Sequence, residues 1–180
     1  MGRVSTRLHK NIYQLTREAL GLSRERAGDI IRTVSADRIE KIESGRVAAY
    51  PEEVLAMAEG YAAPQLCNYY CAKECAIGRD HVREVTMTEL SGIVLEMLAS
   101  LNSMKHKQDR LIEIAADGVI DPAELADFIA IQGELERLTV SAEALRIWTE
   151  KMLAKGDIDL DEYRKHADGK KPEATGKDKL

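Results

Sequence analysis

Residues 15–61 read LTREALGLSRERAGDIIRTVSADRIEKIESGRVAAYPEEVLAMAEGY. Within this segment Ser23 and Ser35 each stand just before an apolar-periodic stretch, where a serine hydroxyl accepts a hydrogen bond from the first turn of a helix. Gly21 suits the end of a preceding helix, and Pro51 suits the first turn of a following one. The sequence therefore predicts four short helices joined by tight turns.

Apolar side chains across residues 8–61 recur at the three- and four-residue spacing of amphipathic helices. The residues predicted to face a shared core are Leu8, Ile12, Leu15, Ala19 and Leu22 in the first helix, Ala27, Ile30 and Ile31 in the second, Ile39 and Ile42 in the third, and Val54, Leu55, Met57, Ala58 and Tyr61 in the fourth. Aromatic residues make up only 4% of the chain, and no stretch favours a strand. We therefore expect an all-α protein.

This segment resembles the Cro/C1-type, or XRE-family, helix-turn-helix domain of transcriptional regulators. The matching residues are Arg17-Glu18, Gly21-Leu22-Ser23, Ala27, Ser35, Ile39, Lys41-Ile42-Glu43, Gly45, Pro51 and the Val54, Leu55, Met57, Ala58 run. The resemblance covers about 50 of the 180 residues. It implies a lambda-repressor-like fold in which the second helix crosses the DNA backbone and the third enters the major groove.

The whole chain is also similar to a group of such regulators from Gram-positive anaerobic bacteria. In that group the DNA-binding domain is followed by a cysteine-containing linker like LCNYYC (66–71) and a helical body like LSGIVLEMLASLNSM (90–104).

The resemblance implies DNA contacts at eight positions. Base edges are expected at Ala36, Asp37, Arg38 and Lys41, and phosphates at Ser23, Arg24, Ser35 and Arg46. Two features depart from the family pattern: the stretch from Asp29 to Ser35 makes the second helix or the turn about two residues longer than usual, and Asp37 and Glu40 put negative charge on the recognition face. A protein-binding role for this domain therefore stays open.

Charge is divided unevenly along the chain. Residues 1–50 hold ten Lys/Arg and six Asp/Glu, whereas residues 51–180 hold sixteen and twenty-five, within a net charge of −5. A basic N-terminal part joined to an acidic C-terminal part fits a DNA-binding domain attached to a body with another task.

All three cysteines fall within nine residues, as Cys67, Cys71 and Cys75. At this spacing they share one face of a helix, where free cysteines usually pack as small apolar side chains. A metal or iron–sulfur site with His81 as a fourth ligand, and a redox sensor, are the alternatives. We expect no resident cofactor.

The C-terminal half predicts long helices. A heptad pattern runs through Leu90, Val94, Met97, Leu101, Met104, Gln108, Leu111 and Ala115. A second apolar stripe begins at Asp121-Pro122 and ends at Gly156, with an interruption or a new cap at Thr139 or Ser141. We expect these two segments to form a hairpin that also offers a dimer face.

The sequence thus predicts four parts: a helix-turn-helix domain (1–63), a cysteine-containing connector (64–86), a helical dimerisation or effector body (87–167) and a disordered tail (168–180). The sequence has no phosphate-binding glycine loop, nucleophile elbow or HExxH motif, no apolar run of membrane-spanning length and no signal peptide. We therefore expect a cytoplasmic protein that is not an enzyme. The expected function is that of a transcriptional regulator acting as a homodimer on a palindromic operator in double-stranded DNA, with a protein or small-molecule effector possible. An adaptor or antagonist of another regulator, and a metal- or redox-responsive sensor, are the alternative functions.

Overall fold

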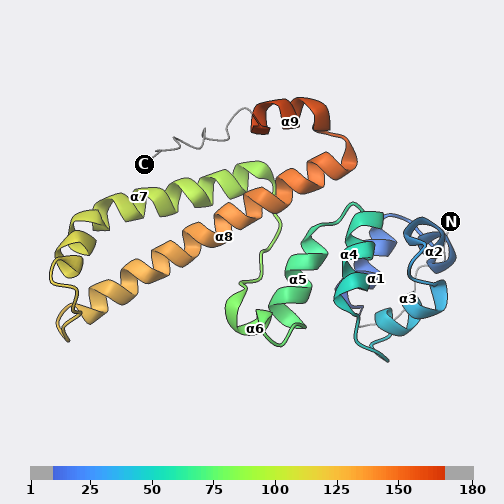
Figure 1. The fold of residues 1–180 in the computed structure, drawn as a ribbon, viewed down its shortest axis with the longest axis horizontal. Helices are drawn as coiled ribbons and strands as arrows, with labels where there is room; N and C mark the ends of the chain where they lie inside the picture. Colours follow the sequence, from blue (N-terminus) through green and yellow to red (C-terminus); the bar gives the residue numbers. More distant parts are fainter. Residues whose placement is uncertain (1–9, 169–180) are drawn as a thin grey trace, which may run out of the picture.

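The computed structural model describes residues 10–168, which contain helices and connecting turns and no strand, as predicted (Figure 1). The helices are α1 (Ile12–Ala19), α2 (Arg24–Ile31), α3 (Ala36–Glu43), α4 (Pro51–Gly60), α5 (Gln65–Lys73), α6 (Gly78–His81), α7 (Leu90–Ala115), α8 (Leu125–Lys155) and α9 (Leu160–Asp168). Helices α1–α5 are called the head below, and α7–α9 the body. The prediction for Leu8 lies outside the described residues, as does that of a disordered tail (168–180) except at Asp168, which ends α9.

The predicted helix starts in the head are confirmed. The Ser23 hydroxyl accepts a hydrogen bond from Arg26 N at 3.2 Å, and the Ser35 hydroxyl accepts one from Arg38 N at 3.3 Å. Helix α4 begins at Pro51. The two serine caps and Pro51 thus set where α2, α3 and α4 begin.

The inward face predicted for α1 is wrong at Leu15 and Ala19, whereas Ile12 and Leu22 pack against the core as predicted. Leu15 is 49% exposed and Ala19 is also exposed, whereas Tyr13, Gln14 and Arg17 are buried. Polar contacts explain this choice of face, because buried Arg17 pairs with a carboxylate of α3, and Tyr13 reaches the end of α5. Two further residues predicted to be inward, Ile30 and Leu55, are 40% and 54% exposed.

The core of the head extends into the segment predicted to be a connector. Leu66 on α5 is fully buried together with Met57 of α4, and the Tyr13 ring meets the Tyr69 ring edge-on at 6.2 Å between centroids. The Tyr13 hydroxyl donates to Glu74 at 3.0 Å. Helix α5 is therefore a structural part of the head.

Helices α7 and α8 form the predicted hairpin, lying side by side along most of their length (Figure 1). The buried positions of α7, however, are Ile93, Ser100 and Ile114, not the heptad series that contains Val94 and Leu101. Val94 and Leu101 are 38% and 46% exposed. The hairpin thus fully buries a neighbouring stripe of α7 with the same period, whereas Met97, Met104 and Leu111 of the predicted series are half-buried.

Helix α8 runs without a break through the predicted interruption. The Thr139 hydroxyl donates to Leu135 O at 2.9 Å, and the Ser141 hydroxyl donates to Leu138 O at 2.9 Å. Each hydroxyl thus bonds back to the preceding turn of its own helix and does not act as a new cap. The helix ends at Gly156, whose φ of 78° is the left-handed conformation that favours glycine.

Side chains of α5 attach the segment between α6 and α7 to the head, and one of them is Lys73, whose Nζ lies 2.8 Å from Glu84 Oε2. Asn68 on α5 donates to Arg83 O at 3.1 Å and accepts from Val85 N at 2.9 Å. Val85 is buried in a second apolar cluster with Ile93 of α7 and Ile147 of α8. The extended residues before α7 therefore bridge the head and the body.

Candidate nucleic-acid interface

Helices α2 and α3 are held at close range by Gly28. A Cβ at this position would lie 3.1 Å from the backbone nitrogen of Ala36, the first residue of α3. Absence of a side chain at Gly28 therefore lets the start of α3 approach α2 this closely. Buried Ala27 and Ile39 fill the space beneath the two helices.

The turn between these helices runs from Arg32 to Ser35. Arg32 has a φ of 63°, and its N–H donates to Gly28 O at 2.8 Å. Because α2 ends at Ile31, residues 32–35 belong to the turn and not to a longer second helix.

Two of the predicted base-reading residues form an ion pair with each other on the exposed side of α3. Lys41 Nζ lies 2.7 Å from Asp37 Oδ2, and their side chains are 43% and 75% exposed. Lys41 thereby lowers the pKa of the Asp37 carboxyl from its ordinary value. Ala36, at the start of the same helix, is half-buried.

The guanidinium of Arg38, a predicted base-reading residue, is engaged within the head. Its guanidinium donates through Nε and Nη2 to Glu53 at 2.6 and 2.8 Å and through Nη2 to Ala48 O at 3.1 Å. It also lies 5.1 Å from the centroid of the Tyr50 ring. Glu53 in turn accepts from Tyr50 N at 2.8 Å. Arg38 therefore joins the first turn of α3 to the first turn of α4.

The predicted phosphate-binding arginines also have carboxylate partners. Arg46 pairs with Glu40, and its side chain is 60% exposed. Arg24 Nε donates to Glu43 at 2.8 Å, with its side chain 34% exposed. Ser23, next to Arg24, caps α2, so its hydroxyl already has a hydrogen-bond donor.

Glu43 is the centre of the polar network inside the head. Its side chain is 1% exposed and accepts from Arg17 Nε and Nη2 at 2.5 and 2.9 Å, besides the bond from Arg24. Arg17 also donates to Leu22 O at 2.5 Å. The network therefore fixes α1, the start of α2 and the end of α3 to one another.

The sequence alone predicts no partner for Glu43, Arg17 or Glu53, although these residues position the recognition helix. The sequence holds one local indication: Glu43 directly follows inward-facing Ile42, so its charged side chain lies at the edge of the core. Because Arg17 and Glu43 are 26 residues apart in sequence, helical periodicity alone cannot pair them.

The cysteines do not form a metal site in the part of the chain described. Among residues 10–168, no group of three or more His, Cys, Asp or Glu side chains is arranged to hold a metal ion. Cys67 packs against the core of the head, and burial raises the pKa of its thiol. Cys71 and Cys75 are half-buried free thiols, and His81 lies exposed in α6.

Within residues 10–168, none of the helices has both the length and the apolar character needed to cross a membrane.

No curated protein and no solved structure matches this chain. Residues 14–68, from α1 into α5, match a family model described as a helix-turn-helix domain. The chain thus carries at its N-terminal end a domain similar to those with which helix-turn-helix regulators bind DNA.

Proposed function

We propose that this protein is a sequence-specific transcriptional regulator that binds an inverted-repeat operator as a homodimer, in the manner of Cro/C1-type regulators. The observation that carries the proposal is the α2–α3 unit, which is capped at both helix starts and presents the outer face of α3 to solvent. Such a unit places a recognition helix in the major groove while the preceding helix crosses the phosphate backbone.

The base-reading set within this proposal is Ala36, Asp37 and Lys41. Asp37 is suited to accept a hydrogen bond from the exocyclic amine of cytosine, and Ala36 to contact a thymine methyl group. Arg38 becomes a positioning residue, since its guanidinium is occupied by Glu53 and Ala48 O. It orients α3 and does not read a base.

Phosphate binding is assigned to Ser23, Arg24, Ser35 and Arg46. Helix starts expose backbone N–H groups and carry partial positive charge, so Ser23 and Ser35 mark two sites where a phosphate is favoured.

The two arginines must exchange a carboxylate for a phosphate on binding. Ion pairs between exposed side chains contribute only about 0–1 kcal/mol, so replacing the Glu40–Arg46 pair with a phosphate contact costs little. Arg24 can also leave Glu43 without stranding that buried carboxylate, because Arg17 holds both of its oxygens.

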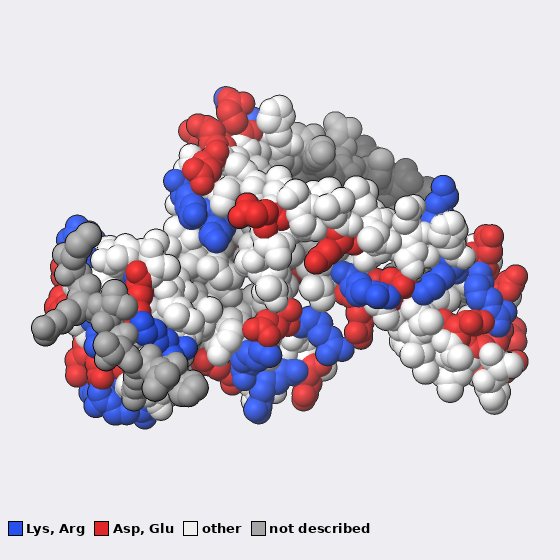
Figure 2. Space-filling model, turned by 180° about the vertical axis from the view of Figure 1, so that it is seen from behind, with Lys and Arg blue, Asp and Glu red and all other residues white. Residues whose placement is uncertain are grey.

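Dimerisation through the body is supported by the apolar stripe that the hairpin leaves exposed on α7. Val94, Leu98 and Leu101 follow one helical face and are 38%, 55% and 46% exposed. Areas without charged side chains extend along the body in Figure 2, with acidic and basic residues gathered beside them. A second copy of the same stripe would cover these side chains and link two heads, which raises the affinity for paired half-sites.

The dimer is tested by analytical ultracentrifugation of Leu98→Glu, with Ala99→Glu as the matched control on the flank of the stripe. The proposal expects a dimer for the wild type and for Ala99→Glu, and a monomer for Leu98→Glu. A wild-type protein that sediments as a monomer, or a Leu98→Glu variant that stays dimeric, contradicts the proposed face.

DNA binding is tested by fluorescence anisotropy with duplex DNA from the region upstream of the chain's own coding sequence, over a range of salt concentrations. Removing one cation that neutralises a phosphate reduces the steepness of log K against log salt by about 0.9, so Arg46→Ala in both heads should reduce it by about two. Arg24→Ala should do the same. Arg137→Ala on α8, an exposed arginine of the body, is the control and should leave the slope unchanged.

A protein-interaction role is the second candidate, and the charge pairing of the recognition face is the observation that favours it. Each of Lys41, Arg38 and Arg46 already has a carboxylate partner, which reduces the positive potential that non-specific DNA binding requires. If the affinity for duplex DNA does not change with salt, and the Arg46→Ala variant binds this DNA as the wild type does, the result favours this adaptor function over DNA binding.

A further inference from the structure

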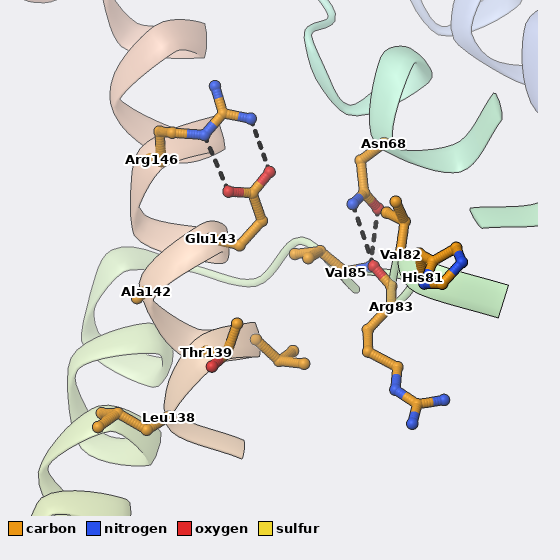
Figure 3. A pocket seen from close by; sticks show the side chains of 11 residues that line it. Asn68, His81, Val82, Arg83, Val85, Leu138, Thr139, Ala142, Glu143 and Arg146 are labelled. Atoms are coloured by element: carbon orange, nitrogen blue, oxygen red, sulfur yellow. Dashed lines mark hydrogen bonds and ion pairs between the residues drawn. The ribbon is translucent and has the colours of Figure 1, made fainter. Parts of the chain in front are cut away.

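A cavity of about 660 Å³ lies where the extended residues before α7 face α8. Figure 3 shows its two walls: Asn68, Val82 and Val85 on one side, and Thr139 and Ala142 of α8 on the other. This volume falls within the range of about 300–1,000 Å³ that is typical of small-molecule sites. The cavity is therefore large enough for a ligand of ordinary metabolite size.

The walls of this cavity are mainly apolar. Val82 and Val85 contribute from the extended segment, and Leu138, Val140 and Ala142 contribute from α8. An apolar ligand surface placed here would leave water, which is favourable at about 25 cal/mol per Å².

The charged groups around the cavity are paired with one another. Arg146 donates to both carboxylate oxygens of Glu143, at 2.6 and 2.9 Å, and also pairs with Glu150. At the other end, Arg83 lies 3.1 Å from Glu136. An ionic ligand would have to break one of these pairs or remain unpaired in apolar surroundings, and both cost free energy.

The neutral polar groups are also occupied. Asn68 uses its amide nitrogen and its oxygen on the backbone of Arg83 and Val85, and the Thr139 hydroxyl donates to Leu135 O. Among the described residues lining the cavity, the His81 side chain, exposed at the edge, has no hydrogen bond or ion pair. The lining thus offers apolar contact and one hydrogen-bonding side chain.

We propose that this cavity is a binding site for an uncharged, mainly apolar small molecule. Its walls come from the segment that Asn68 ties to the head and from α8 of the body, so an occupant contacts both parts at once. This site does not depend on DNA binding by the head, and its test needs no DNA.

The test compares two fluorescent probes that share one aromatic frame: uncharged N-phenyl-1-naphthylamine, and 8-anilinonaphthalene-1-sulfonate, which adds a sulfonate. Titrated into the full-length protein, the uncharged probe should bind once per chain and at least about tenfold more tightly than the sulfonate. Equal or tighter binding of the sulfonate would overturn the assignment of ligand class.

Ala142→Trp locates the bound probe, because the indole would project from α8 into the cavity. It should weaken binding of the uncharged probe by about tenfold or more. The matched control is Ala130→Trp, also exposed on α8 and about 18 Å further along the helix, and it should change affinity by less than about twofold. Unchanged binding by Ala142→Trp, or equal loss in both variants, would place the probe elsewhere and overturn the site.

Circular dichroism and thermal melting check that Ala142→Trp is folded. If it is not, Val82→Trp fills the same cavity from the opposite wall, and the same loss of affinity is expected. Probe binding that survives Val82→Trp overturns the proposal.

Discussion

Replacing Glu43 with glutamine tests the polar network that positions the recognition helix. The substitution keeps the shape of the side chain and removes its charge. It leaves Arg17, whose side chain is only 6% exposed, with the Leu22 carbonyl and the more distant Glu18, whose Oε1 lies 3.9 Å from Arg17 Nη2. Arg24 is 34% exposed and can turn to water, so it adds little to the loss.

The magnitude follows from this difference in burial. Removing one partner of a buried ion pair costs about 3–5 kcal/mol, because the remaining charge stays buried and unpaired. The glutamine oxygen still accepts one hydrogen bond, so Glu43→Gln should lower the free energy of unfolding of the head by about 3 kcal/mol. That change raises the unfolded fraction of the head by roughly a hundredfold. Glu40→Gln, which changes an ion pair at the surface, should cost no more than about 0.5 kcal/mol.

Hydrogen-exchange mass spectrometry measures this loss for the head alone. Peptides from α2 and α3 should exchange roughly a hundredfold faster in Glu43→Gln than in the wild type, whereas peptides from α7 and α8 should be unchanged. The single tryptophan, Trp148, packs in the body cluster, so its fluorescence should not report this local change. If α3 exchanges at the wild-type rate in Glu43→Gln, the network does not hold the helix and the argument from burial is refuted.

Three other positions give further predictions. Arg38 lowers the pKa of Glu53 below its ordinary value of 4.5. The pair therefore stabilises the head above that pH, and its contribution is lost as the pH falls below it. Glu53→Gln should reduce this acid-dependent part of the free energy of unfolding, measured by urea denaturation at several pH values. Gly28→Ala should destabilise the head by about 1–3 kcal/mol in urea denaturation. The control, Gly133→Ala in α8, adds a Cβ that meets nothing within 4 Å and should stabilise the body by about 0.5–1 kcal/mol. Equal effects of the two substitutions would contradict the tight contact of α2 with α3. Burial raises the pKa of the Cys67 thiol. At neutral pH this thiol should therefore react more slowly with a disulfide reagent in the folded protein than in urea. A faster reaction in the folded protein would contradict this expectation and favour the redox-sensor hypothesis.

Local signals in the sequence predicted the frame of the head well. The caps at Ser23 and Ser35 and the proline at the start of α4 depend on groups within one turn of the chain, so neighbouring residues suffice to predict them. The buried face of α1 depends on partners far away in sequence. Arg17 is buried because Glu43 is there to meet it, and apolar periodicity instead favoured Leu15.

The body shows the same limit. Helix α7 carries two adjacent stripes of equal period, one through Ile93 and the other through Val94, and the packing of α8 alone decides which one is buried. The same limit applies to Arg38 in the candidate site. Its place on the recognition helix predicts a base-reading residue. Glu53, 15 residues further on, turns it into a link between α3 and α4.

Selection of bound sequences from a pool of random duplex DNA, followed by sequencing, tests the central claim most directly. The full-length protein should enrich an inverted repeat whose half-sites lie about 10 base pairs apart, one helical turn, because two heads on one dimer read the same face of the duplex. The Lys41→Ala variant should relax the preference at one position in each half-site. A selected pool no different from the input, with the protein folded and dimeric, would contradict sequence-specific DNA binding by this domain.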